Sequence, residues 1–263
     1  MRLSVSNIAW ETADDRNVYE MMKQFGYTGL EIAPTRIFKE QPYECLKKAK
    51  NWKNGIEKDY GFCVPSMQSI WFGKQEKVFG SETERQELLN YTKKAIDFAA
   101  AVGCGNLVFG CPRNRFVPEG KDEKVAIPFF RELGEYALSK GTVVGMEANP
   151  PIYNTNYIND TLSALDLIEE VNSKGFLLNL DVGTMIQNGE DVRELEGKIS
   201  FINHVHISEP GLKPIEKREL HLQLADFLKK ENYSKFVSVE MGKQKDVSSL
   251  KQAMAYVEEV FGK

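Results

Sequence analysis

The stretch of sequence that decides the fold is Phe201-Ile-Asn-His-Val-His-Ile-Ser-Glu209, which contains two of the three histidines of the chain. Its apolar and polar residues alternate, and this period of two is typical of a β-strand. The alternation places His204 and His206 on one face of the predicted strand and Asn203 on the other. A histidine near a strand end says little about function by itself, so the meaning of this stretch depends on the strands around it.

Three other strand-like runs of the sequence each lead directly into an acidic residue. Residues 142–146 precede Glu147, residues 176–180 precede Asp181, and residues 236–239 precede Glu240. Together with His206, four successive strands are therefore predicted to end in Glu, Asp, His and Glu. Exposed strand ends attract acids for reasons of solubility alone. Four in succession are nevertheless uncommon in a chain with 38 acidic residues and three histidines among 263.

Strand and helix patterns alternate along the whole chain. Besides the histidine strand, strands are predicted at residues 2–8, 29–32, 62–67, 106–109, 142–146, 176–180 and 236–239. Helices are predicted at about 15–25, 43–60, 81–102, 122–140, 161–171, 191–199, 216–230 and 247–261. The third of these helices opens with a capping box, since Ser81 is followed three residues later by Glu84.

This alternation predicts the fold class. Strict strand–helix repetition implies parallel strands with right-handed crossovers, and eight such units in about 250 residues is the size of a (β/α)8 barrel. We therefore expect an α/β protein in which residues 1–263 form one TIM barrel domain. A doubly wound open sheet is the alternative. It usually carries a glycine fingerprint, GxGxxG or GxxxxGK[ST], and the sequence contains neither.

Composition and charge narrow the class of partner. The net charge is −4 and acids and bases are interspersed, without the basic stripe that nucleic-acid binding requires. No apolar run approaches the ~20 residues that span a bilayer, and the N-terminus lacks the apolar core of a signal peptide. The four cysteines show no CxxC spacing. We expect a soluble cytoplasmic protein with no nucleic-acid or membrane partner, and a homo-oligomer is compatible with the sequence.

In a barrel the four strand ends share one rim, so their side chains are predicted to converge. Three carboxylates and one imidazole suit a divalent cation such as Mn²⁺, Mg²⁺ or Co²⁺, and Zn²⁺ is also compatible. Strand alternation further predicts that the residues two positions earlier point inward one step lower. Three of these can hydrogen-bond and are expected to orient the ligands: Asn179, His204 and Ser238.

On these residues the chain resembles the xylose isomerase-like barrels, and within them the sugar phosphate isomerase/epimerase group that includes ketose 3-epimerases. The resemblance covers nearly the whole chain and is carried by Met146-Glu147, Leu180-Asp181, His204-Val-His206-Ile-Ser-Glu209 and Val239-Glu240. It implies that Glu147, Asp181, His206 and Glu240 bind one divalent metal. It also implies that Glu147 and Glu240 are the catalytic acid/base pair on opposite faces of a bound carbohydrate substrate.

Two departures from the family pattern concern the substrate. Thr184 stands where the epimerases have a substrate-contacting histidine, and Leu212 and Lys213 stand where they have an arginine. Substrate contacts are therefore expected from polar residues of the rim loops: Gln68, Arg113, Arg115, Asn149, Asn154 and Glu209. The two arginines are equally compatible with solvated surface, and if they face the site they favour an anionic substrate. Trp10 and Trp71 fit an apolar wall for a sugar as well as they fit ordinary loop packing.

The sequence leaves several functions open. The first is a metal-dependent isomerase or epimerase of a small sugar, sugar phosphate or polyol derivative, acting through an enediolate. A dehydratase of an inosose-like ketone begins with the same proton abstraction, and a catalytically silent sugar-binding barrel would keep the same ligands. An abasic-site endonuclease of this fold needs a histidine-rich trinuclear zinc cluster. Three histidines in the whole chain cannot supply that cluster.

Overall fold

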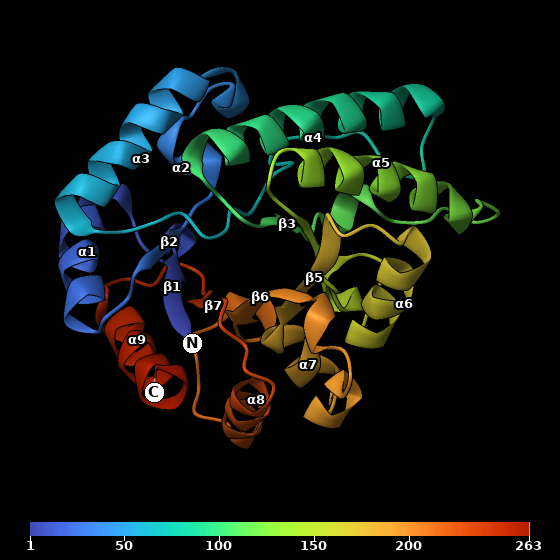
Figure 1. Cartoon of the computed structure of the whole chain (residues 1–263). Coiled ribbons are helices and arrows are strands. Elements are labelled where there is room, and N and C mark those ends of the chain that lie inside the picture. The colour runs from blue at the N-terminus through green and yellow to red at the C-terminus, as the bar shows by residue number, and fades with distance from the viewer. Residues whose placement is uncertain (263) are drawn as a thin grey trace.

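The centre of the molecule is a curled parallel sheet of seven strands in the order β2-β1-β7-β6-β5-β4-β3 (Figure 1). The structure is a computed structural model that describes residues 1–262. The strands are β1 Arg2–Ser6, β2 Gly29–Glu31, β3 Leu107–Phe109, β4 Val144–Met146, β5 Phe176–Asp181, β6 Ile202–Ile207 and β7 Phe236–Val239. All pairs of neighbouring strands are parallel, as the strand–helix alternation predicts.

The segment 62–67 occupies the eighth position and closes the sheet into a barrel. Isolated parallel bridges join Gly29 to Cys63 and Ile32 to Met67 on the side of β2, and Met67 to Leu107 on the side of β3. The predicted strand is present here only as bridges. Pro65 lies in its middle and has no N–H to donate to a strand ladder. The predicted single (β/α)8 barrel is confirmed.

Helices surround the barrel (Figure 1). They are α1 Asp15–Gln24, α2 Pro34–Ile37, α3 Leu46–Tyr60, α4 Glu82–Val102, α5 Ala126–Ser139, α6 Thr161–Val171, α7 Val182–Asn188, α8 Glu219–Lys230 and α9 Ser248–Phe261. The predicted capping box opens α4: the backbone N–H of Glu84 donates to Ser81 Oγ at 3.2 Å, and that of Ser81 donates to Glu84 Oε2 at 2.8 Å. None of the helices within residues 1–262 has the length and hydropathy needed to cross a bilayer.

One predicted helix is misplaced. Residues 191–199 contain only short 3-10 turns, and the helix that follows β5 is α7, which begins immediately after Asp181. Asp181 itself starts this helix, because its Oδ1 accepts a hydrogen bond from the backbone N–H of Thr184 at 2.6 Å. Gly189, with a φ of 70°, ends it.

A β-bulge in the pairing of β5 with β6 changes the face of the histidine strand on which Asn203 lies. Leu178 pairs with Ile202 and Asn179 pairs with His204, so Asn203 is an extra residue without a partner in the ladder. Its Nδ2 donates to Asn106 Oδ1 at 2.9 Å, across the barrel interior. The prediction that Asn203 faces away from the histidines is therefore wrong.

The residues of the strands divide between two environments. Outward-facing apolar side chains such as Val5, Val205 and Val237 are fully buried against the helices and form the main core. The barrel interior instead contains polar side chains that are equally buried, among them Ser4 and Asn179. A barrel interior of this kind supplies hydrogen-bonding groups directly below the carboxyl ends of the strands.

Candidate metal and active site

Four side chains meet at the carboxyl ends of four adjacent strands. Glu147 follows β4, Asp181 ends β5, His206 lies near the end of β6, and Glu240 follows β7. Each offers one potential ligand atom, and these four atoms all lie within 4.8 Å of one another. The structure thus brings together the four residues that the strand-end pattern singled out, because parallel strands of a barrel end at the same rim.

His206 lies at the centre of this group. Its Nδ1 is 3.0 Å from Glu147 Oε1 and 3.2 Å from Glu240 Oε2. Asp181 is held firmly in place, since its Oδ2 accepts a hydrogen bond from the hydroxyl of Ser208 at 2.5 Å while its Oδ1 caps α7. The donor atoms are therefore fixed by backbone and side-chain contacts before any ligand binds.

The accumulated negative charge is strong enough to move several pKa values. Burial and the nearby carboxylates of Glu147 and Glu240 raise the pKa of Asp181 to about 7. Burial also raises the pKa of Glu240. Burial alone would lower the pKa of His206, but the carboxylates of Glu240 and Glu31 raise it well above the usual range. The raised pKa of His206 means that the carboxylates around it stabilise positive charge at this position.

The donor set fits a divalent metal ion. Oxygen ligands and one imidazole suit Mn²⁺, Mg²⁺ or Co²⁺. An octahedral ion with bonds of about 2.1 Å separates neighbouring donors by about 3.0 Å. The separations of 3.0 and 3.2 Å between His206 Nδ1 and the two glutamate oxygens agree with that spacing.

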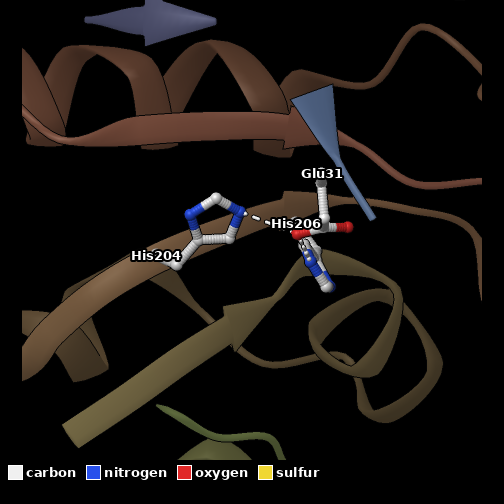
Figure 2. Close-up of side chains that lie close together, drawn as sticks. All are labelled: Glu31, His204 and His206. Carbon is white, nitrogen blue, oxygen red and sulfur yellow. Dashed lines mark hydrogen bonds and ion pairs between the residues drawn. The ribbon is translucent and has the colours of Figure 1, made fainter. Parts of the chain in front are cut away.

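Glu31 is a residue of this site that the sequence interpretation missed. It is the last residue of β2 and is fully buried. Its Oε2 lies 2.9 Å from His206 Nε2 and 3.1 Å from His204 Nε2 (Figure 2). Glu31 also ends a strand, but Ile32 directly follows it, so the sequence pattern predicts a strand that ends one residue later.

The three side chains expected to orient the ligands lie in the layer below. Asn179 Nδ2 donates to Glu147 Oε1 at 2.8 Å and lies 3.3 Å from His206 Nδ1. His204 faces Glu31. Ser238 is paired in register with His206, and its buried hydroxyl has no hydrogen-bond partner among the described residues.

A cavity of about 560 Å³ opens above the four converging residues. Glu147, Asp181 and Glu240 form part of its wall. Among the predicted substrate contacts, four line it: Gln68, Arg113, Asn149 and Glu209. Trp71, Phe72, Tyr153 and Leu212 also line it, so that one part of the cavity is apolar.

Gln68 and Glu209 are already engaged by protein groups. Gln68 Nε2 lies 2.9 Å from Glu240 Oε1, 3.1 Å from Glu31 Oε1 and 2.7 Å from Ser6 Oγ. Glu209 forms a bidentate pair with Arg218, with N···O distances of 2.7 and 2.5 Å. Gln68 therefore links two acidic residues of the site, and Glu209 anchors the loop that follows β6.

Arg115 does not line the cavity. It is fully buried, and its guanidinium donates to the carbonyl oxygen of Glu147 at 2.8 Å and to Asn149 Oδ1 at 2.9 Å. Burial lowers its pKa to about 10. Arg115 is thus neither solvated surface nor a ligand contact, and instead it orders the segment that carries Glu147.

Three other residues considered from the sequence also lie away from the cavity. Asn154 is exposed, with a φ of 60°, and ends the 3-10 turn Pro151–Tyr153. Thr184 donates its hydroxyl hydrogen to the carbonyl of Ala148 at 2.8 Å. Trp10 is buried and donates to Asp15 Oδ1. The polar side-chain atoms of Thr184 and Trp10 thus make structural contacts.

Comparison with known proteins agrees with this architecture. A family model for xylose isomerase-like TIM barrels matches residues 19–260. No curated protein sequence matches the chain. Among solved structures, the chain is similar to D-psicose 3-epimerase from Clostridium cellulolyticum H10, with a TM-score of 0.79, 14% identity, and 99% of each chain covered.

Two further solved structures are similar over nearly their full length. One is 3-keto-D-glucoside 4-epimerase from E. coli, with a TM-score of 0.77, 19% identity, and 98% of this chain and 99% of that chain covered. The other is an AP endonuclease, family 2, from Brucella melitensis, with a TM-score of 0.75, 19% identity and the same coverage. At these identities the likeness shows the fold.

Proposed function

Because the chain belongs to the xylose isomerase-like TIM barrel family, we propose that it is a divalent-metal-dependent isomerase or epimerase of a small sugar, sugar phosphate or polyol derivative. The observation that carries this proposal is the convergence of Glu147, Asp181, His206 and Glu240 beneath one cavity, whose wall includes the three carboxylates. Solved structures of similar fold include epimerases of ketoses and of a ketoglucoside.

The proposed metal would be held by one oxygen from each of the three carboxylates and by Nδ1 of His206. Mn²⁺, Mg²⁺ or Co²⁺ fits these donors best, and Zn²⁺ is compatible with them. A bound divalent ion would supply positive charge next to two adjacent substrate oxygens, which acidifies the neighbouring C–H and stabilises the enediolate.

Glu147 and Glu240 are the proposed acid/base pair. They approach the cavity from β4 and β7, two strands that are separated by β5 and β6 in the sheet. One carboxylate takes the proton from the carbon next to the ketone carbonyl, and the electron pair of the broken C–H bond forms the enediolate. The other carboxyl group returns a proton to that carbon from the opposite face, which inverts it. In an isomerisation the proton is returned to the neighbouring carbon instead.

The buried contacts of both glutamates support this assignment. Asn179 donates to Glu147 Oε1, and Asn149 Nδ2 lies 3.3 Å from Glu147 Oε2. Gln68 donates to Glu240 Oε1. Neutral amide donors of this kind orient a carboxylate without neutralising its charge, which a general base requires.

The test is proton exchange at carbon. In D₂O with Mn²⁺, the protein should place deuterium at a carbon-bound position of at least one member of a panel of sugars, sugar phosphates and inososes, observed by proton NMR. A new epimer or isomer alongside the exchange supports the proposal, whereas loss of water would identify a dehydratase.

Variants show which residues carry the reaction. Glu147→Gln and Glu240→Gln should each abolish turnover, and one of them can retain exchange if only the returning acid is lost. Glu20→Gln, on the exposed side of α1, is the matched control and should exchange at the wild-type rate. If several panel members bind but none exchanges deuterium, the protein is a sugar-binding barrel without catalysis and the proposal is wrong.

A further inference from the structure

The carboxylate of Glu31 connects three buried groups beneath the proposed metal site. Glu31 ends β2, whereas His204 and His206 belong to β6, which lies beyond β1 and β7 in the sheet (Figure 2). Its Oε2 lies 2.9 Å from His206 Nε2 and 3.1 Å from His204 Nε2, and its Oε1 accepts from Gln68 at 3.1 Å. Both oxygens are therefore fixed, and the whole side chain is buried.

The two ring nitrogens of His206 face different partners. Nδ1 faces Glu147 and Glu240, and Nε2 faces Glu31. A neutral imidazole has one N–H and one lone pair, and a carboxylate is only an acceptor. Glu31 therefore keeps a hydrogen on Nε2 when a cation takes the place of the hydrogen on Nδ1. In that state the lone pair of Nδ1 is directed at the space between the carboxylates of Glu147 and Glu240, where the cation would lie.

A rival interpretation is that Glu31, His204 and His206 themselves hold an ion, since their ligand atoms lie within 4.8 Å of one another. Such an ion would occupy Nε2 of His206. The adjacent site would then need Nδ1 of the same ring, and a neutral imidazole cannot give up both positions. All three side chains are also almost completely buried, which leaves no water to complete a coordination shell. The hydrogen bonds of Glu31 with His206 and Gln68, together with the approach of His204 Nε2 to its Oε2, account for the contacts without these costs.

We propose that Glu31 is a positioning residue that presents Nδ1 of His206 to the metal. This role rests on the metal site of the proposed function. His204 and Gln68 hold Glu31 from its two oxygens, and Gln68 also reaches Glu240 Oε1 at 2.9 Å. The position of one metal ligand is thereby coupled to the position of a proposed catalytic glutamate.

Metal affinity tests the proposal directly. Glu31→Gln keeps the shape of the side chain but introduces an amide that can donate to Nε2 and so favour the wrong tautomer. We expect the Kd for Mn²⁺, measured by isothermal titration calorimetry, to rise about 10–100-fold, as it does when such a partner is removed. Glu20→Gln is the control for the lost negative charge, because Glu20 lies on the exposed side of α1 and pairs with Lys23. Its Kd should stay within about twofold of the wild type, as for an independent site.

The wild-type protein offers a second measurement that does not depend on whether a variant folds. The chain has only three histidines, so the ¹⁵N spectrum of its imidazoles is simple to assign. With Zn²⁺ bound, His206 should show a metal-shifted Nδ1 and a protonated Nε2. A metal on Nε2 of His206 would overturn the proposal.

The outcomes separate this inference from the proposed function. If Glu31→Gln binds Mn²⁺ as tightly as the wild type, only the role of Glu31 is wrong. If the wild type binds two ions per chain and Glu31→Gln binds one, a metal site at Glu31, His204 and His206 replaces the proposed positioning role. If the wild type binds Mn²⁺ and Glu31→Gln binds it more weakly as expected, but no sugar exchanges deuterium, the proposed function fails and the role of Glu31 stands. If the wild type binds no Mn²⁺, both fail.

Discussion

Arg113 and Arg115 lie two residues apart in the loop after β3 and have opposite environments. Arg113 is exposed and lines the cavity, whereas Arg115 is fully buried and binds the carbonyl oxygen of Glu147. The sequence pattern predicts the same environment for both arginines, because both follow the same strand end. Arg113 lies inside the 3-10 turn Pro112–Asn114, whereas Arg115 is the residue that ends this turn.

This difference gives a prediction for stability. Arg115→Met keeps an apolar stem of similar length but leaves buried acceptors, among them the carbonyl of Glu147, without a donor. The free energy of unfolding should fall by about 3 kcal/mol in urea titrations. Arg113→Met should change it by less than about 0.5 kcal/mol, as surface substitutions do. Equal losses in the two variants would contradict the buried role of Arg115.

Asp181 gives a second prediction, which concerns pH. Its pKa in the folded, metal-free protein is raised from 3.8 to about 7. A carboxyl with a raised folded pKa contributes stability that is complete below the unfolded pKa and is lost as the pH rises through the folded one. Between about pH 4 and pH 7 the charged Asp181 thus becomes a growing cost to folding in the absence of metal.

Asp181→Asn removes this cost while keeping the side-chain shape. In EDTA at pH 8 the variant should be more stable than the wild type by on the order of 1 kcal/mol or more, and the difference should shrink towards pH 4. With excess Mn²⁺ the order should reverse, since the variant has lost a ligand. Thermal melts at pH 5 and pH 8 with EDTA or Mn²⁺ measure both effects. A variant that is less stable than the wild type in EDTA at pH 8 would refute the interpretation.

At the scale of single residues, the sequence identified the four converging side chains but not all of their supporting contacts. Glu147, Asp181, His206 and Glu240 could be found because each lies at or next to the end of a strand with a clear apolar run. Glu31 was missed because β2 has only three residues, too few for the period of two to define its end. Asn203 was assigned to the wrong face because a bulge adds one residue without changing the apolar pattern.

At the scale of elements, local capping chemistry explains both the correct and the incorrect boundaries. The capping box of α4 was recognised because Ser81 and Glu84 precede a long helical pattern. The start of α7 was missed because Asp181 serves both as the end of β5 and as the N-cap of the following helix. No loop residues separate the two elements, so the pattern offered no boundary.

The capping box supplies the prediction at this scale. Ser81→Ala removes the acceptor for the backbone N–H of Glu84 and should lower the free energy of unfolding by about 1 kcal/mol. Ser139→Ala, at the exposed C-terminal end of α5, should change it by less than about 0.5 kcal/mol. The affinity for Mn²⁺ should not change in either variant, because neither residue is near the site. Equal stability of the two variants in urea would show that the cap contributes little.

At the scale of the whole molecule, barrel closure could be predicted, whereas the walls of the cavity could not. The alternation of strands and helices extends over the entire chain. It is therefore recognisable even though the segment around Pro65 pairs with its neighbours only through isolated bridges. The cavity depends on loops, where Phe72, Tyr153 and Leu212 come from segments without any period. Leu212 has a positive φ of 54°, a backbone conformation that is uncommon for leucine and that the sequence pattern does not predict.

The last prediction concerns the folded molecule together with the proposed metal. A ligand that binds only the folded state stabilises it by about 2.7 kcal/mol at one hundred times its Kd. For a chain of this size that corresponds to a rise in Tm of roughly 5–10 °C. Adding Mn²⁺ to the EDTA-treated protein should therefore raise the Tm by this amount, and elemental analysis should find one ion per chain. Glu147→Gln, which lacks one of the four donors, should show a much smaller rise at the same Mn²⁺ concentration. An unchanged melting curve of the wild type, with no metal found after dialysis against Mn²⁺, would remove the basis for a metal at the rim of this barrel.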